Sequence, residues 1–352
     1  MPDTMRAVVK PAPGPGAELR DVPIPRPGPH EALVKIRATS MCGTDLHIYR
    51  WDPWAAEHFH PTPMVFGHEY CGDIVEVGSD VSLVKVGDFV SGETHIGCGH
   101  CHLCRTGQAH LCLNMEMVGV TRPGCFAEYI AIPEENLWVN RPDLPVEIAA
   151  IQEPFGNAVH TTLSGDIAAR GTLVMGCGPI GLFAVGIARA AGAAPIWAVD
   201  VNDYRLDLAV TMGATRVINS TREDPVAIVM ADTGGDGADV VLEMSGAPAG
   251  IRQAFQALRV GGRISMLGLP AAPFEFDFAN LLVLKGAEVH GIFGRKMFET
   301  WYRTRTLLGE GLVDVAPLIT HRMSLEEFHQ GIELLIHGQA GKVILYPERR
   351  GE

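Results

Sequence analysis

The chain has 352 residues, which is enough for two domains with hydrophobic cores of their own. Its 47% hydrophobic and 20% charged residues are typical of a globular protein. The formal net charge of −13 argues against a nucleic-acid partner, because the phosphate backbone is itself anionic. The N-terminal MPDTMRAVVK lacks the apolar segment of a secretory signal, and the uncharged run 172–188 is broken by glycine and proline and too short to span a membrane. We therefore expect a cytoplasmic protein without membrane partners.

The first 150 residues predict a β-rich domain. Short runs of β-branched and aromatic residues, broken by glycine and proline, predict strands over 32–36, 74–77, 89–90 and 127–130. Nine of the fourteen histidines and six of the eight cysteines lie before residue 113. Because these residue types bind transition metals, we expect the metal chemistry in this part of the chain.

Two segments of this domain, MCGTDLHIYRWDPW and GHEY, offer ligands for a catalytic zinc ion. Such a site needs three protein ligands and one open coordination position. The candidates are Cys42, His68 and Glu69. Taken singly, a cysteine or a histidine would be interpreted as core packing, so the prediction depends on the three residues together.

The segment CGHCHLCRTGQAHLC, residues 98–112, spaces four cysteines by two, two and seven residues. Four thiolates can bind zinc tetrahedrally and leave no open position, which predicts a structural site at Cys98, Cys101, Cys104 and Cys112. The alternatives are disulfides, which a reducing compartment disfavours, and an iron–sulfur cluster, whose motif carries its fourth cysteine three residues on and before proline. We expect the intervening His100, His102 and His110 to be solvated.

Predicted strands and helices alternate from residue 151 to residue 296. The strands are expected over 172–175, 196–200, 216–219, 239–244, 263–267 and 288–292, and the helices over 179–191, 203–212, 225–231 and 248–258. Strands joined by crossover helices indicate an α/β fold, a doubly wound parallel sheet of the Rossmann type. Residues 297–352 lose this alternation and end in a predicted strand over 342–346, so we expect them to complete the first domain of residues 1–150.

The segment TLVMGCGPIGLFAVGIARAAGAAPIWAVD places Gly176, Gly178 and Gly181 between a predicted strand and a predicted helix. In such a turn the glycines admit a dinucleotide pyrophosphate, and the helix N-terminus offers it free N–H groups. Asp200, at the end of the next strand, would bind the adenosine ribose and repel a 2′-phosphate, which predicts NAD rather than NADP. Arg205 argues for NADP, because a nearby arginine can accommodate the 2′-phosphate. We expect the Arg205 side chain to pack over the adenine instead.

Over essentially its full length the sequence resembles the medium-chain alcohol dehydrogenases. The resemblance rests on three motifs in order: Cys42 ahead of the run from Gly67 to Val81, the four-cysteine segment, and the nucleotide fingerprint. It implies a GroES-like β domain, formed by both ends of the chain and embracing a Rossmann domain, with the active site in the cleft between them. It also implies two zinc ions per chain, one catalytic and one structural.

The same resemblance implies the roles of individual residues. Cys42, His68 and Glu69 would hold the catalytic zinc, with Glu153 beside it, although members often carry aspartate at this point, so Glu153 could be a ligand or a proton-relay group. Thr44 and His47 would carry the hydroxyl proton to solvent. His95 is a candidate for the wall of the substrate pocket. Further cofactor contacts are implied at Ile180, Leu267, Gly268, Leu269, Ile292 and Phe293.

Five further segments, CGTDLHIYRWDPW, RPGCFAEY, EPFGNAVHT, EMSGAP and MFETWY, resemble the threonine 3-dehydrogenase branch of that family. This implies oxidation of L-threonine by NAD to L-2-amino-3-oxobutanoate, in a cytoplasmic homotetramer. A polyol or 2,3-butanediol dehydrogenase would keep every motif above. A non-catalytic NAD-sensing zinc protein would keep the glycines and the four cysteines, but it would not need Cys42, His68 and Glu69 together.

Overall fold

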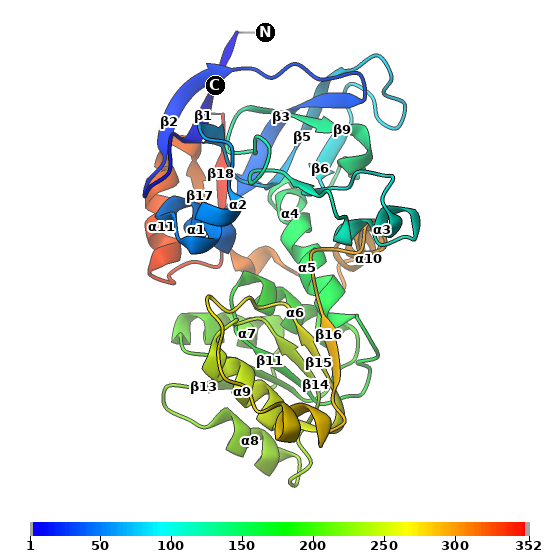
Figure 1. The fold of residues 1–352 in the computed structure, drawn as a ribbon, viewed down its shortest axis with the longest axis vertical. Helices are drawn as coiled ribbons and strands as arrows, with labels where there is room; N and C mark the ends of the chain where they lie inside the picture. The colour runs from blue at the N-terminus through cyan, green and yellow to red at the C-terminus, as the bar shows by residue number, and fades with distance from the viewer. Residues whose placement is uncertain (1–2, 349–352) are drawn as a thin grey trace. The chain divides into compact units, whose positions relative to one another are not determined.

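The computed structural model describes residues 3–348, which form two compact units. Among these residues, the first unit comprises 3–154 with 319–348, and the second comprises 155–318. Residues 297–318, which the sequence analysis grouped with the end of the chain, pack within the second unit, and the chain returns to the first unit at Ile319. Each unit has its own principal sheet and its own hydrophobic core (Figure 1).

The first unit is built on a seven-stranded sheet to which both ends of the described chain contribute. The late strand β18 (Lys342–Tyr346, red in Figure 1) pairs antiparallel with the early strand β3 (Glu31–Ser40), with Ile344 opposite Ser40. The remaining strands are β10 (Leu137–Val139), β6 (Phe89–Gly92) and β5 (Glu69–Val77) on one side of β3, β17 (Ile319–Ser324) beyond β18, and β9 (Tyr129–Pro133) paired with β3. Through this pairing, a strand near the end of the chain lies in the same sheet as the early strands.

Two smaller sheets and several short helices complete the first unit. The sheets are β2 (Glu18–Pro23), β1 (Thr4–Lys10) and β4 (Met64–Val65), and the pair β7 (His95–Ile96) and β8 (Glu116–Met117). The helices are α1 (Gly43–Arg50), α2 (Pro53–His58), α3 (His102–Arg105), α4 (Val146–Ala150) and α11 (Phe328–Ile336). A further helix, α5 (Gln152–Thr162), begins in the first unit and continues into the second. The 3-10 turns are η1 (Ala109–Leu111), η2 (Glu134–Asn136) and η5 (Leu325–Glu327).

An aromatic cluster holds the late helix α11 against the early part of the chain. The ring centroids of Phe66, Phe126 and Phe328 lie 5.3–5.6 Å from one another in edge-to-face arrangements, and all three rings are fully buried or nearly so. Such pairs add about 0.5–1.5 kcal/mol each beyond the burial of their apolar area. The cluster therefore fixes the segment around Phe66, which leads directly into the candidate ligands His68 and Glu69.

The second unit is a doubly wound sheet of six parallel strands, as predicted. The spatial order is β13 (Arg216–Asn219), β12 (Ile196–Asp200), β11 (Thr172–Met175), β14 (Ala238–Glu243), β15 (Leu258–Met266) and β16 (Glu288–Gly291). Strands β11 and β12 are buried at every position, which explains their continuous apolar sequence. The strand order reverses between β11 and β14, and in such sheets ligands bind at the carboxyl ends of the strands at that point.

The crossover helices begin where proline or a capping side chain stands at the first turn. They are α6 (Pro179–Ala190), α7 (Asp203–Met212), α8 (Pro225–Asp232) and α9 (Pro248–Ala257); α10 (Glu299–Gly309), a π-helical turn at Ala279–Val283 and a 3-10 turn at Ala316–Leu318 follow. Asp224, for example, caps α8 by accepting hydrogen bonds from the N–H groups of Val226 and Ala227. Among residues 3–348, no helix is both long and apolar enough to cross a membrane.

Candidate metal centres and nucleotide site

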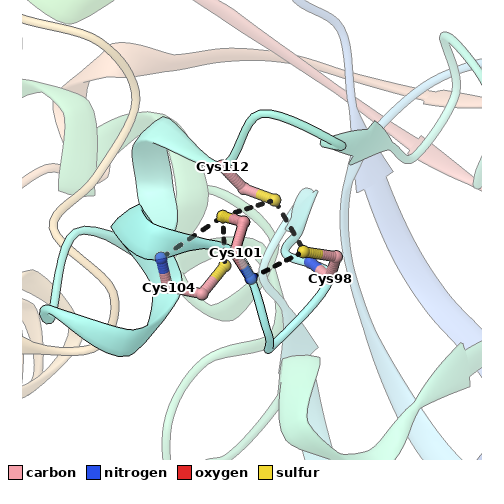
Figure 2. A group of neighbouring side chains, drawn as sticks. All are labelled: Cys98, Cys101, Cys104 and Cys112. Atoms are coloured by element: carbon pink, nitrogen blue, oxygen red, sulfur yellow. Dashed lines mark hydrogen bonds between the residues drawn. The ribbon is translucent and has the colours of Figure 1, made fainter.

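The four cysteines of residues 98–112 converge on one point of a small lobe that contains α3 and η1 (Figure 2). The Sγ atom of Cys101 lies 3.5 Å from that of Cys104 and 3.8 Å from that of Cys112. A disulfide would need ~2.05 Å, whereas the edge of a tetrahedron with Zn–S bonds of ~2.3 Å is ~3.8 Å. The four sulfur atoms therefore fit a single tetrahedral ion and leave no room for an iron–sulfur cluster at their centre.

Backbone amides of the lobe are directed at these sulfur atoms, as thiolates require. The N–H of Cys98 donates to Cys112 Sγ at 3.2 Å, and that of Cys101 donates to Cys98 Sγ at 3.4 Å. The N–H groups of His100 and Cys101 lower the pKa of Cys98 to about 6. Of the three histidines between the cysteines, His100 and His102 are exposed, but His110 is only 6% exposed, so the prediction that it is solvated was wrong.

The second group of candidate ligands is Cys42, His68 and Glu69, whose ligand atoms all lie within 4.8 Å of one another. Cys42 is the N-cap residue of α1, and His68 and Glu69 stand at the start of β5. His68 and Glu69 are buried, and Cys42 is partly exposed. The structure thus brings Cys42 to the adjacent pair His68 and Glu69, which lie 26 and 27 positions further along the chain.

Gly67 sets the direction of the chain just before these two ligands. Its φ is +88°, a left-handed conformation that favours glycine, and an added Cβ would lie 2.6 Å from the ring of Phe126. Gly119 and Gly124 approach its carbonyl so closely that a Cβ on either would meet Gly67 O at 2.2 Å. The glycines of this corner are therefore required for the close packing that positions His68.

The three ligands sit in a strongly acidic environment, which favours a bound cation. Asp45 is fully buried; it accepts a hydrogen bond from the N–H of Cys42 at 2.7 Å, and its Oδ1 lies 3.8 Å from His68 Nδ1. Burial raises the pKa of Asp45 to about 6. Burial alone would lower the pKa of His68, but the charges of Cys42, Asp45 and Glu153 raise it to about 10. A divalent ion would neutralise the same charges.

Glu69 has one carboxylate oxygen engaged and the other available. Oε2 accepts hydrogen bonds from Ser40 Oγ and from Lys342 Nζ, and Lys342 also donates to the carbonyl of Met41 at 2.8 Å. Among the described residues, no hydrogen-bond partner reaches the buried Oε1 of Glu69. An orphaned carboxylate oxygen beside a thiol and an imidazole is the donor set that zinc binds, so the residues present fit this ion.

Glu153, on α5, is buried near this group but is not one of its three converging ligands. Its Oε1 accepts a hydrogen bond from Thr94 Oγ1 at 2.9 Å, and Thr94 Oγ1 also lies 3.1 Å from the carbonyl oxygen of His68. His95, the next residue, is 7% exposed. The segment at Thr94 therefore links Glu153 to the metal ligands.

Thr44 and His47 lie on α1, one turn apart, and so they face the same side of the helix. Thr44 Oγ1 is 3.8 Å from Cys42 Sγ. The His47 side chain is 53% exposed, and its Nδ1 contacts Asp52 Oδ2. The geometry suits a path for a proton from the neighbourhood of Cys42 to solvent.

The nucleotide fingerprint forms the predicted strand, turn and helix in the second unit. Gly176 has a φ of +95°, and a Cβ on Gly181 would meet Gly176 O at 1.9 Å. Asp200 Oδ2 accepts a hydrogen bond from the N–H of Cys177 at 2.7 Å, so the acidic residue also shapes the glycine turn. Gly176, Gly178 and Asp200 line a cavity of about 460 Å³, together with Arg205 and Ser245.

Arg205 lies beside Asp200, with Nη1 3.9 Å from Asp200 Oδ2. The other predicted cofactor residues stand around the same edge of the sheet: Ile180 is in the first turn of α6, Leu267–Leu269 follow β15, and Ile292 and Phe293 follow β16. Because the carboxyl ends of parallel strands meet at one edge, the structure groups all of these residues there. Leu269 and Phe293 are exposed by 77% and 45%.

Comparison with known proteins agrees with this geometry. Residues 28–143 match the family described as "Alcohol dehydrogenase GroES-like domain", and residues 179–310 match "Zinc-binding dehydrogenase". An L-threonine 3-dehydrogenase of Symbiobacterium thermophilum is 52% identical over 99% of both chains, and one of Bacillus subtilis is 51% identical over 97% of this chain and 99% of its own. The chain belongs to the zinc-binding medium-chain dehydrogenases.

Solved structures place this dehydrogenase among the same proteins. A putative zinc-binding dehydrogenase from Sinorhizobium meliloti bound to NADP has a TM-score of 0.90, with 30% identity over 98% of this chain and 100% of its own. The 2R,3R-butanediol dehydrogenase from Bacillus subtilis has a TM-score of 0.88, again with 30% identity over 98% and 100% of the two chains. The zinc-binding and nicotinamide-binding character of the family therefore extends to this chain.

Several residues that contact Cys42, His68, Glu69 or Glu153 were not predicted from the sequence. Asp45 follows Cys42 by three residues, a capping-box spacing that could have identified it. Ser40 and Thr94 carry no comparable signal. Lys342 is 273 positions from Glu69, and only the pairing of β18 with β3 brings the two side chains together.

Proposed function

We propose that this dehydrogenase oxidises the β-hydroxyl of L-threonine with NAD⁺ to give L-2-amino-3-oxobutanoate and NADH. The observation that carries the proposal is the full-length similarity, at about half of all positions, to several proteins named L-threonine 3-dehydrogenase. The convergence of Cys42, His68 and Glu69, and the cavity lined by Gly176, Gly178 and Asp200, also support the proposal.

Cys42, His68 and Glu69 would hold the catalytic zinc, because the three are the converging donors and Glu69 Oε1 has no other use. When bound, the ion supplies Lewis-acid polarisation that makes a secondary hydroxyl acidic near neutral pH, and the nicotinamide accepts the hydride. Asp45 holds the backbone of Cys42 and lies beside His68, so it orients two of the ligands. Lys342 and Ser40 fix the orientation of Glu69.

The hydroxyl proton leaves through side chains of α1. Thr44, next to the Cys42 sulfur, accepts it from the substrate and passes its own proton on. His47, one turn further along and half exposed, receives that proton and delivers it to water. Because both residues stand on one face of a short helix, the path needs no rearrangement of the chain.

Glu153 would attract the ammonium group of the amino-acid substrate. It is a buried carboxylate, held through Thr94, close enough to His68 to influence its charge. A neutral diol has no ammonium group to pair with this charge. The carboxylate therefore favours threonine over a diol as substrate.

Asp200 supports NAD over NADP. Its carboxylate is held by the N–H groups of Cys177 and Val201 and faces the nucleotide cavity. A negative charge fixed at this position would repel a 2′-phosphate. The position of Arg205, beside Asp200, is consistent with a role in packing against the adenosine portion.

We further propose two zinc ions per chain, a homotetramer and a cytoplasmic location. The convergence of Cys98, Cys101, Cys104 and Cys112 supports the proposal of a second zinc ion. Exposed apolar side chains on β16 and on the segment just before it, which we call the β16 edge patch, support an oligomer; they are Phe278, Val283, Leu284 and Val289. Patches of this kind are commonly subunit interfaces.

The substrate can be tested by following NAD reduction with L-threonine, 2,3-butanediol, sorbitol and ethanol in parallel. The expected result is the highest kcat/KM with L-threonine. A higher kcat/KM with butanediol or sorbitol would reject threonine and leave only a zinc-dependent dehydrogenase. In addition, Glu153→Gln should lower kcat/KM for threonine more than for butanediol.

A further inference from the structure

The ring of His47 is held by the turn that follows α1. Its Nδ1 contacts Asp52 Oδ2, and the backbone N–H of Asp52 donates to the carbonyl of His47 at 3.3 Å. The ring of Trp54 also lies near the His47 ring, tilted against it, with the two centroids 5.8 Å apart. A histidine that is half exposed would otherwise be free to rotate, so this frame restricts its orientation.

The Asp52 side chain is itself held in place by a second hydrogen bond. Its Oδ1 accepts a hydrogen bond from the N–H of Ala55 at 3.0 Å and so caps the N-terminus of α2. Trp51, just before it, adopts a left-handed conformation with φ of 57° and packs its ring against Phe59. One carboxylate therefore binds a helix N-terminus with one oxygen and the His47 ring with the other.

The charges around the pair are few. Burial would raise the pKa of Asp52, but the His47 ring and the N–H of Ala55 hold it below its ordinary value, so the group is an anion near neutral pH. On α1, Arg50 is exposed one turn beyond His47. On α2, His58 stacks on the far side of Trp54.

We propose that Asp52 is a positioning residue that sets the tautomer of His47 for proton transfer; this inference rests on the proposed function. A carboxylate anion can only accept a hydrogen bond, so the neutral ring must carry its proton on Nδ1. Nε2 then holds the lone pair that accepts the proton released through Thr44. The imidazolium returns that Nε2 proton to water, and the ring is restored in the same tautomer.

Asp52→Asn tests this role because asparagine keeps the cap but reverses the other hydrogen bond. Its amide oxygen can still accept from Ala55, whereas its NH₂ group can donate to Nδ1 and favour the tautomer with the proton on Nε2. The ring would then present a donor where the relay needs an acceptor. Asp224→Asn, at the N-cap of α8 in the other unit, is the matched control for a cap that has no histidine partner.

The experiment measures kcat and KM of the zinc-loaded protein with L-threonine at increasing concentrations of a tertiary-amine buffer that binds zinc weakly. At low buffer, Asp52→Asn should lower kcat by about tenfold with little change in KM for NAD, and added buffer should restore most of the loss. Asp224→Asn should behave as the unmodified protein. A merely structural defect would not respond to buffer.

A second arm combines the change with His47→Gln. If Asp52 acts through His47, the double variant should be no slower than His47→Gln alone, and both should be rescued by buffer. The proposal is overturned if Asp52→Asn keeps the kcat of the unmodified protein at low buffer, or if buffer does not restore its kcat. It is also overturned if the decreases in kcat caused by Asp52→Asn and by His47→Gln multiply in the double variant. Threonine oxidation by the unmodified protein is measured in the same series, so failure of the proposed function is seen separately.

Discussion

A buried carboxylate with one oxygen neutralised and one left open is the residue-scale feature that most clearly indicates a metal site. Glu69 and Lys342 have side chains that are 0% and 1% exposed, so neither charge is stabilised by water. Their attraction offsets the desolvation of both groups only while the pair is intact. The same arrangement leaves Glu69 Oε1 directed at the ligands Cys42 and His68.

Replacing Lys342 tests whether the stability of the fold depends on the intact pair of Glu69 and Lys342. In the metal-free protein, Lys342→Met leaves the buried Glu69 carboxylate without its counter-charge, and we expect a loss of roughly 3–5 kcal/mol in the free energy of unfolding. Adding Glu69→Gln should recover much of this loss, although not activity. Denaturant unfolding of both variants measures the effect. If Lys342→Met alone were as stable as the unmodified protein, the ion pair of Glu69 and Lys342 would not stabilise the fold.

The catalytic ligands themselves should matter for activity more than for stability. Cys42 lies at the surface end of the cluster, as the N-cap of α1, and its side chain carries none of the core. Cys42→Ser should abolish threonine oxidation and remove one zinc ion per chain, while the circular dichroism spectrum stays unchanged. Retained turnover at more than a few per cent would remove Cys42 from the ligand set.

The proposed preference for NAD over NADP depends on one residue, Asp200. Asp200→Ala removes both an acceptor for the ribose and a charge that repels a 2′-phosphate, so KM for NAD should rise by about ten- to hundredfold and the preference over NADP should narrow. Asp203→Asn, on the exposed first turn of the next helix, is the control and should leave KM for NAD unchanged. Equal use of both cofactors by the unmodified protein would contradict the role of Asp200.

At the scale of elements, the cysteine lobe has almost no core of its own. Helix α3 spans only His102–Arg105 and has no buried residue, and Leu111 and Leu113 are exposed by 37% and 75%. So little apolar burial cannot offset the conformational entropy of ordering the segment. We therefore expect the lobe to need a metal ion to hold its fold.

Loss of one thiolate should unfold this lobe. Cys104→Ser is expected to lower the zinc content from two ions to one per chain and to lower the melting temperature by several degrees. His102→Asn, on the same short helix and exposed, should change neither quantity. If metal analysis of the unmodified protein gives one zinc ion or finds iron, the assignment of the four cysteines is wrong.

At the scale of the whole molecule, the six-stranded sheet of the second unit ends in an open edge. Among the described strands of this sheet, β16 is the last in the order, and the exposed apolar residues of the β16 edge patch lie on it and on the segment before it. An unpaired edge with apolar neighbours is prone to association, and a second copy of the chain would cover it.

Charged residues placed in the β16 edge patch should therefore lower the molecular mass of the oligomer in solution. Val283→Lys with Leu284→Lys, at residues that are 69% and 72% exposed, should reduce the mass measured by light scattering to a smaller oligomer or a monomer. Leu312→Lys, at a residue of the same unit that is 57% exposed, should not. An unchanged mass in the double variant would exclude the patch as an interface.

Local patterns in the sequence were sufficient for much of the fold and for the ligands. The predicted bounds of β11, β12, β13 and α7 agree with the structure, because apolar runs and capping residues act over a few positions. β15 begins earlier than predicted, at Leu258, and α10 was not predicted at all. The spacing of the four cysteines likewise predicted their convergence, since ligands within fifteen residues need only one short loop to meet.

Only the tertiary structure decided what surrounds those ligands. Lys342 reaches Glu69 because the last strand of the chain pairs with β3, and Thr94 reaches Glu153 across 59 positions. His110 is buried by contacts that its exposed neighbours His100 and His102 do not share. Periodicity and spacing encode interactions between residues close in the chain; the electrostatic environment of a site depends on packing between distant segments, which no local pattern specifies.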